Sequence, residues 1–356
     1  MEEKMAKEEL LQRVGDIDQL GYLRLDQSLQ GPSKGVRRAS FRTAEGLTFA
    51  VSLDRGMDIP YAYYRGRPLC WRSPVPERAP SYYEPGGDGW LRSFFGGALT
   101  TCGLTHFGPP AEEDGEGHGL HGRISNVPAD EVAPHSRWRG DRYLLSVRGK
   151  MRQAKVFGEN LSLTRTVRTE LRSKRIEIHD EVENLSFRRT PQMILYHINV
   201  GYPLLDSNSR LNIEPDRFEL EGVDERAEAE LDRFNSFSSP QPGYEERVYQ
   251  MDFGGDRGRG EDDQGLNQAL VLTNPHLDEG LGLAVRFNSD QLPYAVEWKM
   301  MGQGEYALGL EPANCPHLPR AQLEERDELP YLEPGESRSY DLAIEVVEEK
   351  SVGNGP

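Results

Sequence analysis

Two segments far apart in the chain each place an ionisable residue among apolar, strand-like neighbours. The first, MILYHINVGYP at 193–203, holds His197, and the second, YALGLEPANCP at 306–316, holds Glu311. A buried histidine or carboxylate is costly unless it is paired, hydrogen-bonded or used in chemistry. Imidazole and carboxyl groups are also common general acids and bases. The two residues therefore form a candidate acid–base pair, although a core histidine and a strand-end carboxylate are the ordinary readings of each alone.

The stretch 90–126 holds the densest set of side chains suited to binding a ligand. It reads WLRSFFGGALTTCGLTHFGPP and, further on, HGLHGRISN. Its aromatic residues offer apolar platforms and its polar residues offer hydrogen bonds: Trp90, Phe94 and Phe95, then His118, His121, Arg123 and Asn126. A sugar needs both kinds of contact, because its ring has an apolar C–H face and a polar rim. The alternative is that the aromatics are core and the glycines are turns.

Two further features allow a functional and a structural interpretation. His118 and His121, with His197 and Glu311, supply ligand types that suit a transition metal, but their spacing matches no metal motif, so we expect no bound metal. In the run VSLDRGMDI at 51–59, Arg55 is either part of a local turn or a ligand for hydroxyl or carboxylate oxygens.

Composition restricts the partners and the compartment. The net charge of −17 disfavours nucleic acid and anionic membranes as partners. Mean hydropathy is −0.69, and no apolar run has the length of a membrane span. The N-terminus lacks the apolar core of a signal peptide, and the three cysteines form no CxxC, so we expect a reducing, cytoplasmic location without disulfides.

The pattern along the chain predicts an all-β protein. After a helix at roughly 3–14, within an N-terminal segment 1–20, short strand-like runs alternate with turn residues. The expected strands are 36–43, 47–53, 142–149, 161–169, 175–183, 192–199, 269–273, 281–288, 294–299, 305–311 and 339–347. Because no long amphipathic helices alternate with them, a β-sandwich or barrel is favoured over a parallel α/β fold.

Two regions depart from this pattern. Residues 221–266 are acidic, Gly-rich and weakly periodic, and we interpret them as an excursion from a single domain that spans 1–356. Their Gly-rich end lacks the GK[ST] signature of a phosphate loop, so a nucleotide site is not expected. Residues 74–122 are also irregular, and long irregular stretches in compact proteins are often functional.

Several runs together resemble the aldose 1-epimerase (galactose mutarotase-like) superfamily, and most closely its DUF4432 branch. They lie between residues 51 and 340 and read SLDRGMDI, SFFGGALTTCGL, HGLHGRISNVPA, DEVENL, LYHINVGYPLLD, LEPANCP and LEPGESRSY. The resemblance implies a large twisted antiparallel β-sandwich, the galactose mutarotase-like supersandwich, behind the short N-terminal helix. It further implies that the concave face binds a monosaccharide or sugar derivative, without a cofactor.

The resemblance also assigns roles to residues. A glutamate in a Leu-Glu-Pro context acts as base in this superfamily and matches Glu311, while a mid-chain histidine acts as acid and matches His197. A histidine in a Leu-His-Gly setting matches His121. The surrounding HINVGYP departs from the Asn-His-x-Tyr-Phe pattern of typical galactose mutarotases. The aspartate that contacts sugar hydroxyls there has no close counterpart, and Asp206 is the nearest candidate.

The resulting hypothesis is an aldose 1-epimerase that opens and recloses a sugar hemiacetal. We expect ionised Glu311 to take the O1 proton and protonated His197 to supply the ring oxygen, each charge favouring the other. The residues expected to contact the sugar are Arg55, His121, Arg123, Asn199 and Asn314. Two alternatives remain: an isomerase, epimerase or lyase for an oxidised or acidic sugar, suggested by Arg55, Arg92 and Arg123, and a non-catalytic sugar-binding module.

Overall fold

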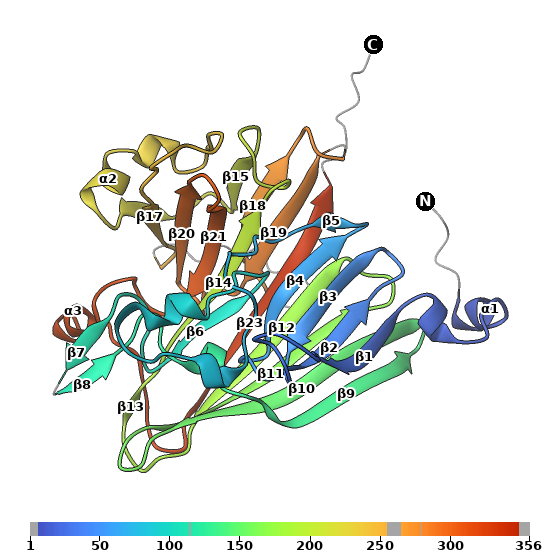
Figure 1. Ribbon diagram of the computed structural model, residues 1–356, viewed down its shortest axis with the longest axis horizontal. Coiled ribbons are helices and arrows are strands. Elements are labelled where there is room, and N and C mark those ends of the chain that lie inside the picture. Colours follow the sequence, from blue (N-terminus) through green and yellow to red (C-terminus); the bar gives the residue numbers. More distant parts are fainter. Residues whose placement is uncertain (1–5, 114, 255–264, 279, 349–356) are drawn as a thin grey trace.

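Three antiparallel sheets carry most of the regular structure (Figure 1). The computed structural model describes residues 6–113, 115–254, 265–278 and 280–348. The first sheet contains, in order, β1 (Tyr22–Gln27), β2 (Arg37–Arg42), β3 (Leu47–Ser52), β4 (Asp58–Tyr64) and β5 (Arg67–Pro68). The second contains β15 (Arg210–Glu214), β18 (Gln268–Asn274), β19 (Leu281–Phe287), β23 (Ser337–Glu348), β12 (Arg175–Asn184), β11 (Asn160–Glu170), β10 (Arg142–Ala154) and β9 (Asp130–Arg139).

The third sheet holds both members of the candidate pair. Its strands are, in order, β16 (Glu219–Gly222), β17 (Arg247–Asp252), β20 (Tyr294–Met301), β21 (Tyr306–Ala313), β14 (Met193–Gly201) and β6 (Thr100–Leu104). Two short ribbons pair β7 (Ala111–Glu113) with β8 (Glu116–His118), and β13 (Thr190–Pro191) with β22 (Tyr331–Leu332). The expected all-β, antiparallel architecture is confirmed.

Helices are short and lie outside the sheets. The α-helices are α1 (Lys7–Leu11), α2 (Glu225–Glu228) and α3 (Arg320–Glu325). The 3-10 helices are η1 (Ile17–Gln19), η2 (Pro80–Tyr82), η3 (Gly87–Arg92), η4 (Ile124–Asn126) and η5 (Leu231–Arg233). Within the described residues, none is long and apolar enough to span a membrane. The predicted N-terminal helix, roughly 3–14, is confirmed at 7–11. Residues 12–14 lie beyond its end, and residues 3–5 lie outside the described part.

Period-2 alternation explains which side of each strand faces the core. On β12, Ile176, Ile178 and Val182 are buried and alternate with more exposed positions, as expected for a sheet with one solvated face. By contrast, β14 is buried at every position, on both of its faces. One face joins a hydrophobic cluster drawn from all three large sheets. The other face joins a second cluster that contains Trp90 and Phe94.

An ion-paired network lies inside the protein where the three sheets meet. Arg165 on β11 contacts Asp180 on β12 at 2.7 Å and Asp58 on β4 at 3.1 Å, and these ionic side chains are fully buried. The hydroxyl of Tyr196 on β14 donates to Asp180 at 2.8 Å. The network therefore links the strand that carries His197 to the two other sheets.

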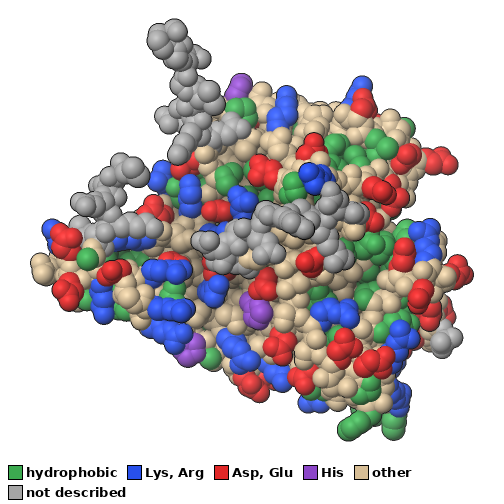
Figure 2. All heavy atoms as spheres, turned by 180° about the vertical axis from the view of Figure 1, so that it is seen from behind, with side chains coloured by type: hydrophobic (Ala, Val, Ile, Leu, Met, Phe, Trp, Pro, Cys, Tyr) green, Lys and Arg blue, Asp and Glu red, His purple; other side chains and the backbone are tan. Residues whose placement is uncertain are grey.

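The region 221–266 is more regular than its sequence indicates. Strand β17 occupies its second half and pairs with β20 over six residue positions, so the interpretation of this region as an excursion is wrong for 247–252. Its residues 255–264 lie outside the described part. Elsewhere the expected strands are confirmed, and the three cysteines are free and buried. On the face shown in Figure 2, acidic and basic side chains are interspersed.

Candidate active site

The register of two neighbouring strands places His197 beside Glu311. Ile198 on β14 pairs with Leu310 on β21, so the next position along the ladder sets His197 opposite Glu311. Residues directly opposite in an antiparallel pair project from the same face of the sheet. The Nε2 atom of His197 lies 3.1 Å from Oε1 of Glu311. The imidazole and carboxyl groups that were predicted as a pair from distant segments of the sequence are thus in direct contact.

A glycine leaves the space that the carboxyl group occupies. Gly309 precedes Glu311 by two residues and therefore shares its face of β21. A Cβ atom built on Gly309 would lie 2.1 Å from Oε1 of Glu311 and 3.0 Å from Cβ of Trp298. Any larger side chain at this position would displace the carboxyl group.

Aromatic rings surround the imidazole of His197. The ring centroids of Phe94, Trp298 and Trp90 lie 5.1, 5.6 and 6.3 Å from that of His197. His121 completes the set at 5.8 Å, with its ring nearly perpendicular. Trp90 and Phe94 belong to the 90–126 stretch, which the sequence singled out as a ligand-binding region. The pair lies beneath this aromatic cover, with only 4 % of His197 and 2 % of Glu311 exposed.

Polar atoms at the site are left without hydrogen-bond partners. Nδ1 of His197, Oδ1 of Asn199 and Oε1 of Glu311 are buried and accept or donate no hydrogen bond among the described residues. Native proteins satisfy nearly all buried polar groups, so three such atoms on one face call for an explanation. Hydroxyl groups of a bound ligand would provide the missing partners.

Burial dominates the electrostatics of the pair. It lowers the pKa of His197 from the ordinary 6.5 to about 3, aided by the field of His317 and opposed by the nearby side chain of Asn199. It also raises the pKa of Glu311 well above 4.5, aided by the carboxylate of Glu246. Burial thus works against our expectation that each group holds the other in its charged form, because lost solvation disfavours both charges.

The pair nevertheless holds one proton. A neutral imidazole with a protonated carboxyl carries the same number of protons as an imidazolium with a carboxylate. With the pKa of His197 low and that of Glu311 high, one proton is retained over a wide pH range. One group can therefore give a proton while the other accepts one.

His121 and Asn199 also lie at the site. His121 has a backbone φ of 57°, and its Nδ1 accepts a hydrogen bond from the amide of Gly108 at 3.4 Å. Burial lowers its pKa well below 6.5, so its ring is neutral. The side-chain amide of Asn199 donates to the carbonyls of Gly97 and His197. Both residues thus lie near the pair, and their contact with a substrate stays a prediction.

Arg55 and Asn314 have structural contacts in place of the expected hydroxyl contacts. The three guanidinium nitrogens of Arg55 donate to the carbonyls of Ser125, Arg78 and Ser93, and the residue is 1 % exposed. The amide of Asn314 donates to Gln192 and to the Tyr340 hydroxyl. Its Oδ1 accepts from the amide of Ile194. Each residue holds loops or strands together, and its hydrogen-bonding groups are already occupied.

Arg123 and Asp206 lie apart from the pair. Arg123 is exposed and lines a surface hollow with His106 and His118. Asp206 shapes a turn after β14, where its carboxylate accepts from the amide of Asn208 at 2.6 Å. The structure does not bring either side chain into contact with His197 or Glu311.

Of the four residues that we weighed as metal ligands, His118 lies apart from the other three. The ring of His118 packs on His106 at 5.3 Å, away from the aromatic cover. Within the described residues, no three His, Cys, Asp or Glu side chains are placed to hold a metal ion.

Two residues of the site, Trp298 and Gly309, were not predicted from the sequence. Trp298 has no flanking motif, and only its place on β20, next to Gly309 across the ladder, brings it to His197. Gly309 could have been predicted, because residues two apart in a strand project from the same face, so Gly309 and Glu311 lie on one face of β21.

Solved structures share this architecture across nearly the whole chain. A Klebsiella pneumoniae protein with the provisional name aldose 1-epimerase superposes with a TM-score of 0.84, at 23 % identity, covering 93 % of this chain and 86 % of its own. The galactose 1-epimerase of Lactobacillus acidophilus gives 0.60 at 14 % identity, covering 92 % and 99 %. A galactose mutarotase-like protein of Clostridium acetobutylicum gives 0.57 at 15 %, covering 92 % and 99 %. These similarities define the fold as galactose mutarotase-like.

The sequence itself places the chain within one family. Residues 33–346 match the family described as "Domain of unknown function (DUF4432)", and the chain belongs to that family. Among curated proteins, none matches the sequence.

Proposed function

We propose that this protein is an aldose 1-epimerase that interconverts the anomers of a monosaccharide or sugar derivative. One observation supports this most directly: His197 and Glu311 lie 3.1 Å apart beneath an aromatic cover. Anomer exchange needs one proton given and one accepted, at two oxygens bonded to the same carbon. The galactose mutarotase-like fold supports the same class of substrate.

The reaction requires only proton transfers within this pair. Glu311, protonated in the resting site, gives its proton to the ring oxygen as the bond from C1 to that oxygen breaks. His197 takes the proton of the O1 hydroxyl as the C1=O1 double bond forms. The open-chain aldehyde rotates about C1–C2, and closure on its other face returns both protons. Each positioned group contributes roughly 10²–10⁴-fold.

Opening the ring converts the neutral pair into carboxylate and imidazolium. From that charged form, Glu311 acts as base and His197 as acid, which are the roles that the superfamily resemblance implies. The two proton arrangements are thus successive states of one cycle. Because the transfers are reversible, each residue serves as acid in one direction and base in the other.

Substrate entry requires the cover to move. With His197 and Glu311 only 4 % and 2 % exposed, a sugar ring reaches them after Trp90, Phe94 or Trp298 shifts. The indole of Trp298 is held by Glu246 Oε2 at 2.7 Å, an exposed hydrogen bond that can break at low cost. Once the rings repack on the C–H face of the sugar, water is excluded from the transfers.

The contacts of the arginines weaken the alternative of an acidic sugar, which was based on their presence in the sequence. Arg55 is occupied by three backbone carbonyls, and Arg92 is exposed and pairs with Glu84 at 3.4 Å.

The three free cysteines are in keeping with a reducing, cytoplasmic location.

The decisive experiment compares two glutamate variants. Anomer exchange is measured by polarimetry and by NMR in D₂O over a panel of neutral aldoses and uronic acids. Glu311→Gln should lower the rate at least about 10²-fold while substrate binding persists. Glu297→Gln, also fully buried but on the opposite face of the sheet, should keep the rate within a few-fold. It controls for loss of a buried carboxyl group.

Three results would argue against the proposal. Undiminished exchange by folded Glu311→Gln would remove the pair from the mechanism. Deuterium incorporation at a sugar carbon would indicate enolisation and favour the isomerase or lyase alternative. Sugar binding without any acceleration of exchange would favour a binding module.

A further inference from the structure

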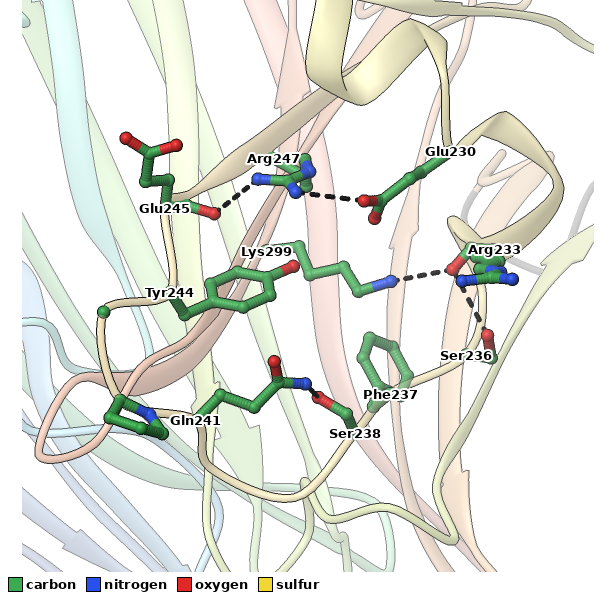
Figure 3. A pocket seen from close by; sticks show the side chains of 12 residues that line it. Glu230, Arg233, Ser236, Phe237, Ser238, Gln241, Tyr244, Glu245, Arg247 and Lys299 are labelled. Carbon is green, nitrogen blue, oxygen red and sulfur yellow. Dashed lines mark hydrogen bonds and ion pairs between the residues drawn. The ribbon is translucent and has the colours of Figure 1, made fainter.

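A second cavity lies on the other side of strand β20, outside the candidate active site. Its volume is about 440 Å³, within the range of small-molecule sites. Side chains alternate along β20, so Trp298 faces His197 whereas Lys299 faces this cavity (Figure 3). The residues that line it are Glu230, Arg233, Ser236, Phe237, Ser238, Gln241, Pro242, Gly243, Tyr244, Glu245, Arg247 and Lys299.

Lys299 is buried in the wall of this cavity. The residue is 4 % exposed, and its Nζ donates to the carbonyl of Arg233 at 2.7 Å. Its ammonium also lies 5.4 Å from the ring of Phe237 and 6.0 Å from that of Tyr249. An ammonium group has three N–H donors. One is satisfied by the carbonyl, and the others have no hydrogen-bond acceptor among the described residues.

The carboxylates in the wall are already neutralised. Glu230 pairs with Arg247 at 3.0 Å, and Glu245 pairs with Arg226 at 2.7 Å. The guanidinium of Arg233 makes no ion pair within the described part of the chain. Two cationic groups, Arg233 and Lys299, therefore lack an ion-pair partner at this cavity.

The carboxyl group of Glu297 acts on Lys299 but does not fully balance its charge. Glu297 is fully buried two residues earlier on β20, and neither of its oxygens accepts a hydrogen bond among the described residues. Burial raises its pKa to about 8, so it is mainly protonated at neutral pH. Burial also lowers the pKa of Lys299, as expected for a cation without a full counter-charge.

We propose that this cavity is a binding site for a small anion, with a phosphate or carboxylate group held by Lys299 and Arg233. The hydroxyl groups of Ser238 and Tyr244 line the same wall and can donate to anion oxygens. Gln241 Nε2 donates to the Ser238 hydroxyl at 2.8 Å, which leaves the proton of that hydroxyl available. The cavity exceeds the size of a bare ion, so the anionic group belongs to a small organic molecule. This site is independent of the proposed epimerase activity.

Calorimetric titration of the full chain tests the site. The probes are inorganic phosphate and malonate, against chloride at matched ionic strength. We expect saturable binding of at least one probe, weakened roughly ten-fold or more in Lys299→Met and in Arg233→Gln. Lys34→Met makes the same chemical change at an exposed lysine outside the cavity and should bind as the wild type does. Phosphate-only or malonate-only binding each supports the site and identifies the group it accepts.

Arg233→Gln keeps the test decisive even if Lys299→Met fails to fold, because Arg233 is exposed. The proposal is overturned if neither probe binds saturably at millimolar concentrations. It is equally overturned if folded Arg233→Gln binds both probes with wild-type affinity.

Discussion

Replacing Gly309 by alanine should disable the His197–Glu311 pair while the fold persists. The added Cβ would lie 2.1 Å from Oε1 of Glu311, whereas ordinary contact begins near 3.4 Å. The oxygen must therefore retreat by 3.4 − 2.1 = 1.3 Å. Its contact with Nε2 of His197, now 3.1 Å, is lengthened or bent by a similar amount.

This displacement separates activity from stability. A misplacement of about 1 Å at a reacting group costs roughly 10²-fold in rate, or about 2.7 kcal/mol of transition-state stabilisation. The steric cost to the fold is about 1–3 kcal/mol. Part of it is offset by about 0.5–1 kcal/mol, because alanine loses less chain entropy than glycine on entering a strand. The free energy of unfolding should thus change by about 2 kcal/mol or less.

The assay is the rate of anomer exchange on a sugar that the wild type accelerates, with urea unfolding in parallel. Gly302→Ala is the matched control, since the nearest atom to its added Cβ would be the flexible end of Met300, at 3.3 Å, and the next residue, Glu305, lies at an ordinary 3.9 Å. That variant should keep its activity. The reasoning is refuted if folded Gly309→Ala exchanges anomers as fast as the control, because the carboxyl position would then not matter.

Two further predictions concern stability. Arg165→Met leaves Asp58 and Asp180 buried without their counter-charge and should lower the free energy of unfolding by about 3–5 kcal/mol in urea. Arg168 lies on the same strand as Arg165 and forms a surface pair with Glu177 on β12, so Arg168→Met should change the free energy of unfolding by about 1 kcal/mol or less. Equal effects of the two substitutions would contradict this account. Burial lowers the pKa of His197 to about 3 and of His106 to about 4, so stability present above pH 6.5 is lost as pH falls toward those values, by up to about 1.4 kcal/mol per pH unit each. The lowered pKa values of His121 and His317 add to this loss, whereas the raised pKa values of Glu297, Glu311 and Asp58 oppose part of it. An unfolding midpoint in urea no lower at pH 5 than at pH 6.5 would show that the buried histidines do not dominate this balance.

Local sequence patterns predicted the strands because alternation records which side of a strand is buried. Ile176, Ile178 and Val182 show this on β12. The same logic fails on β14, which is buried on both faces, so the direction of His197 could not be read from periodicity. Strand β17 was missed because its apolar positions are few and acidic, Gly-rich sequence surrounds it.

The site was predictable in its chemistry and less so in its contacts. His197 and Glu311 stood out because ionisable groups in apolar strands are rare. Arg55 and Asn314 were also expected to contact the sugar, but the carbonyl groups that occupy them come from residues distant in sequence. Only the folded chain reveals whether a polar side chain is already satisfied. The mutual burial that keeps the pair neutral is likewise a property of the assembled sheet.

The position of the pair across β14 and β21 also restricts how the sequence can change in length. A slip of one residue between these strands would turn either His197 or Glu311 to the opposite face, where the hydrophobic core lies. Insertions are therefore tolerable in the turn 302–305 that precedes β21, but a single insertion or deletion between Gly309 and Glu311 would separate the carboxyl group from its partner. The geometry of the candidate pair depends on the alignment of two backbones, which makes strand length as much a determinant of the proposed activity as residue identity.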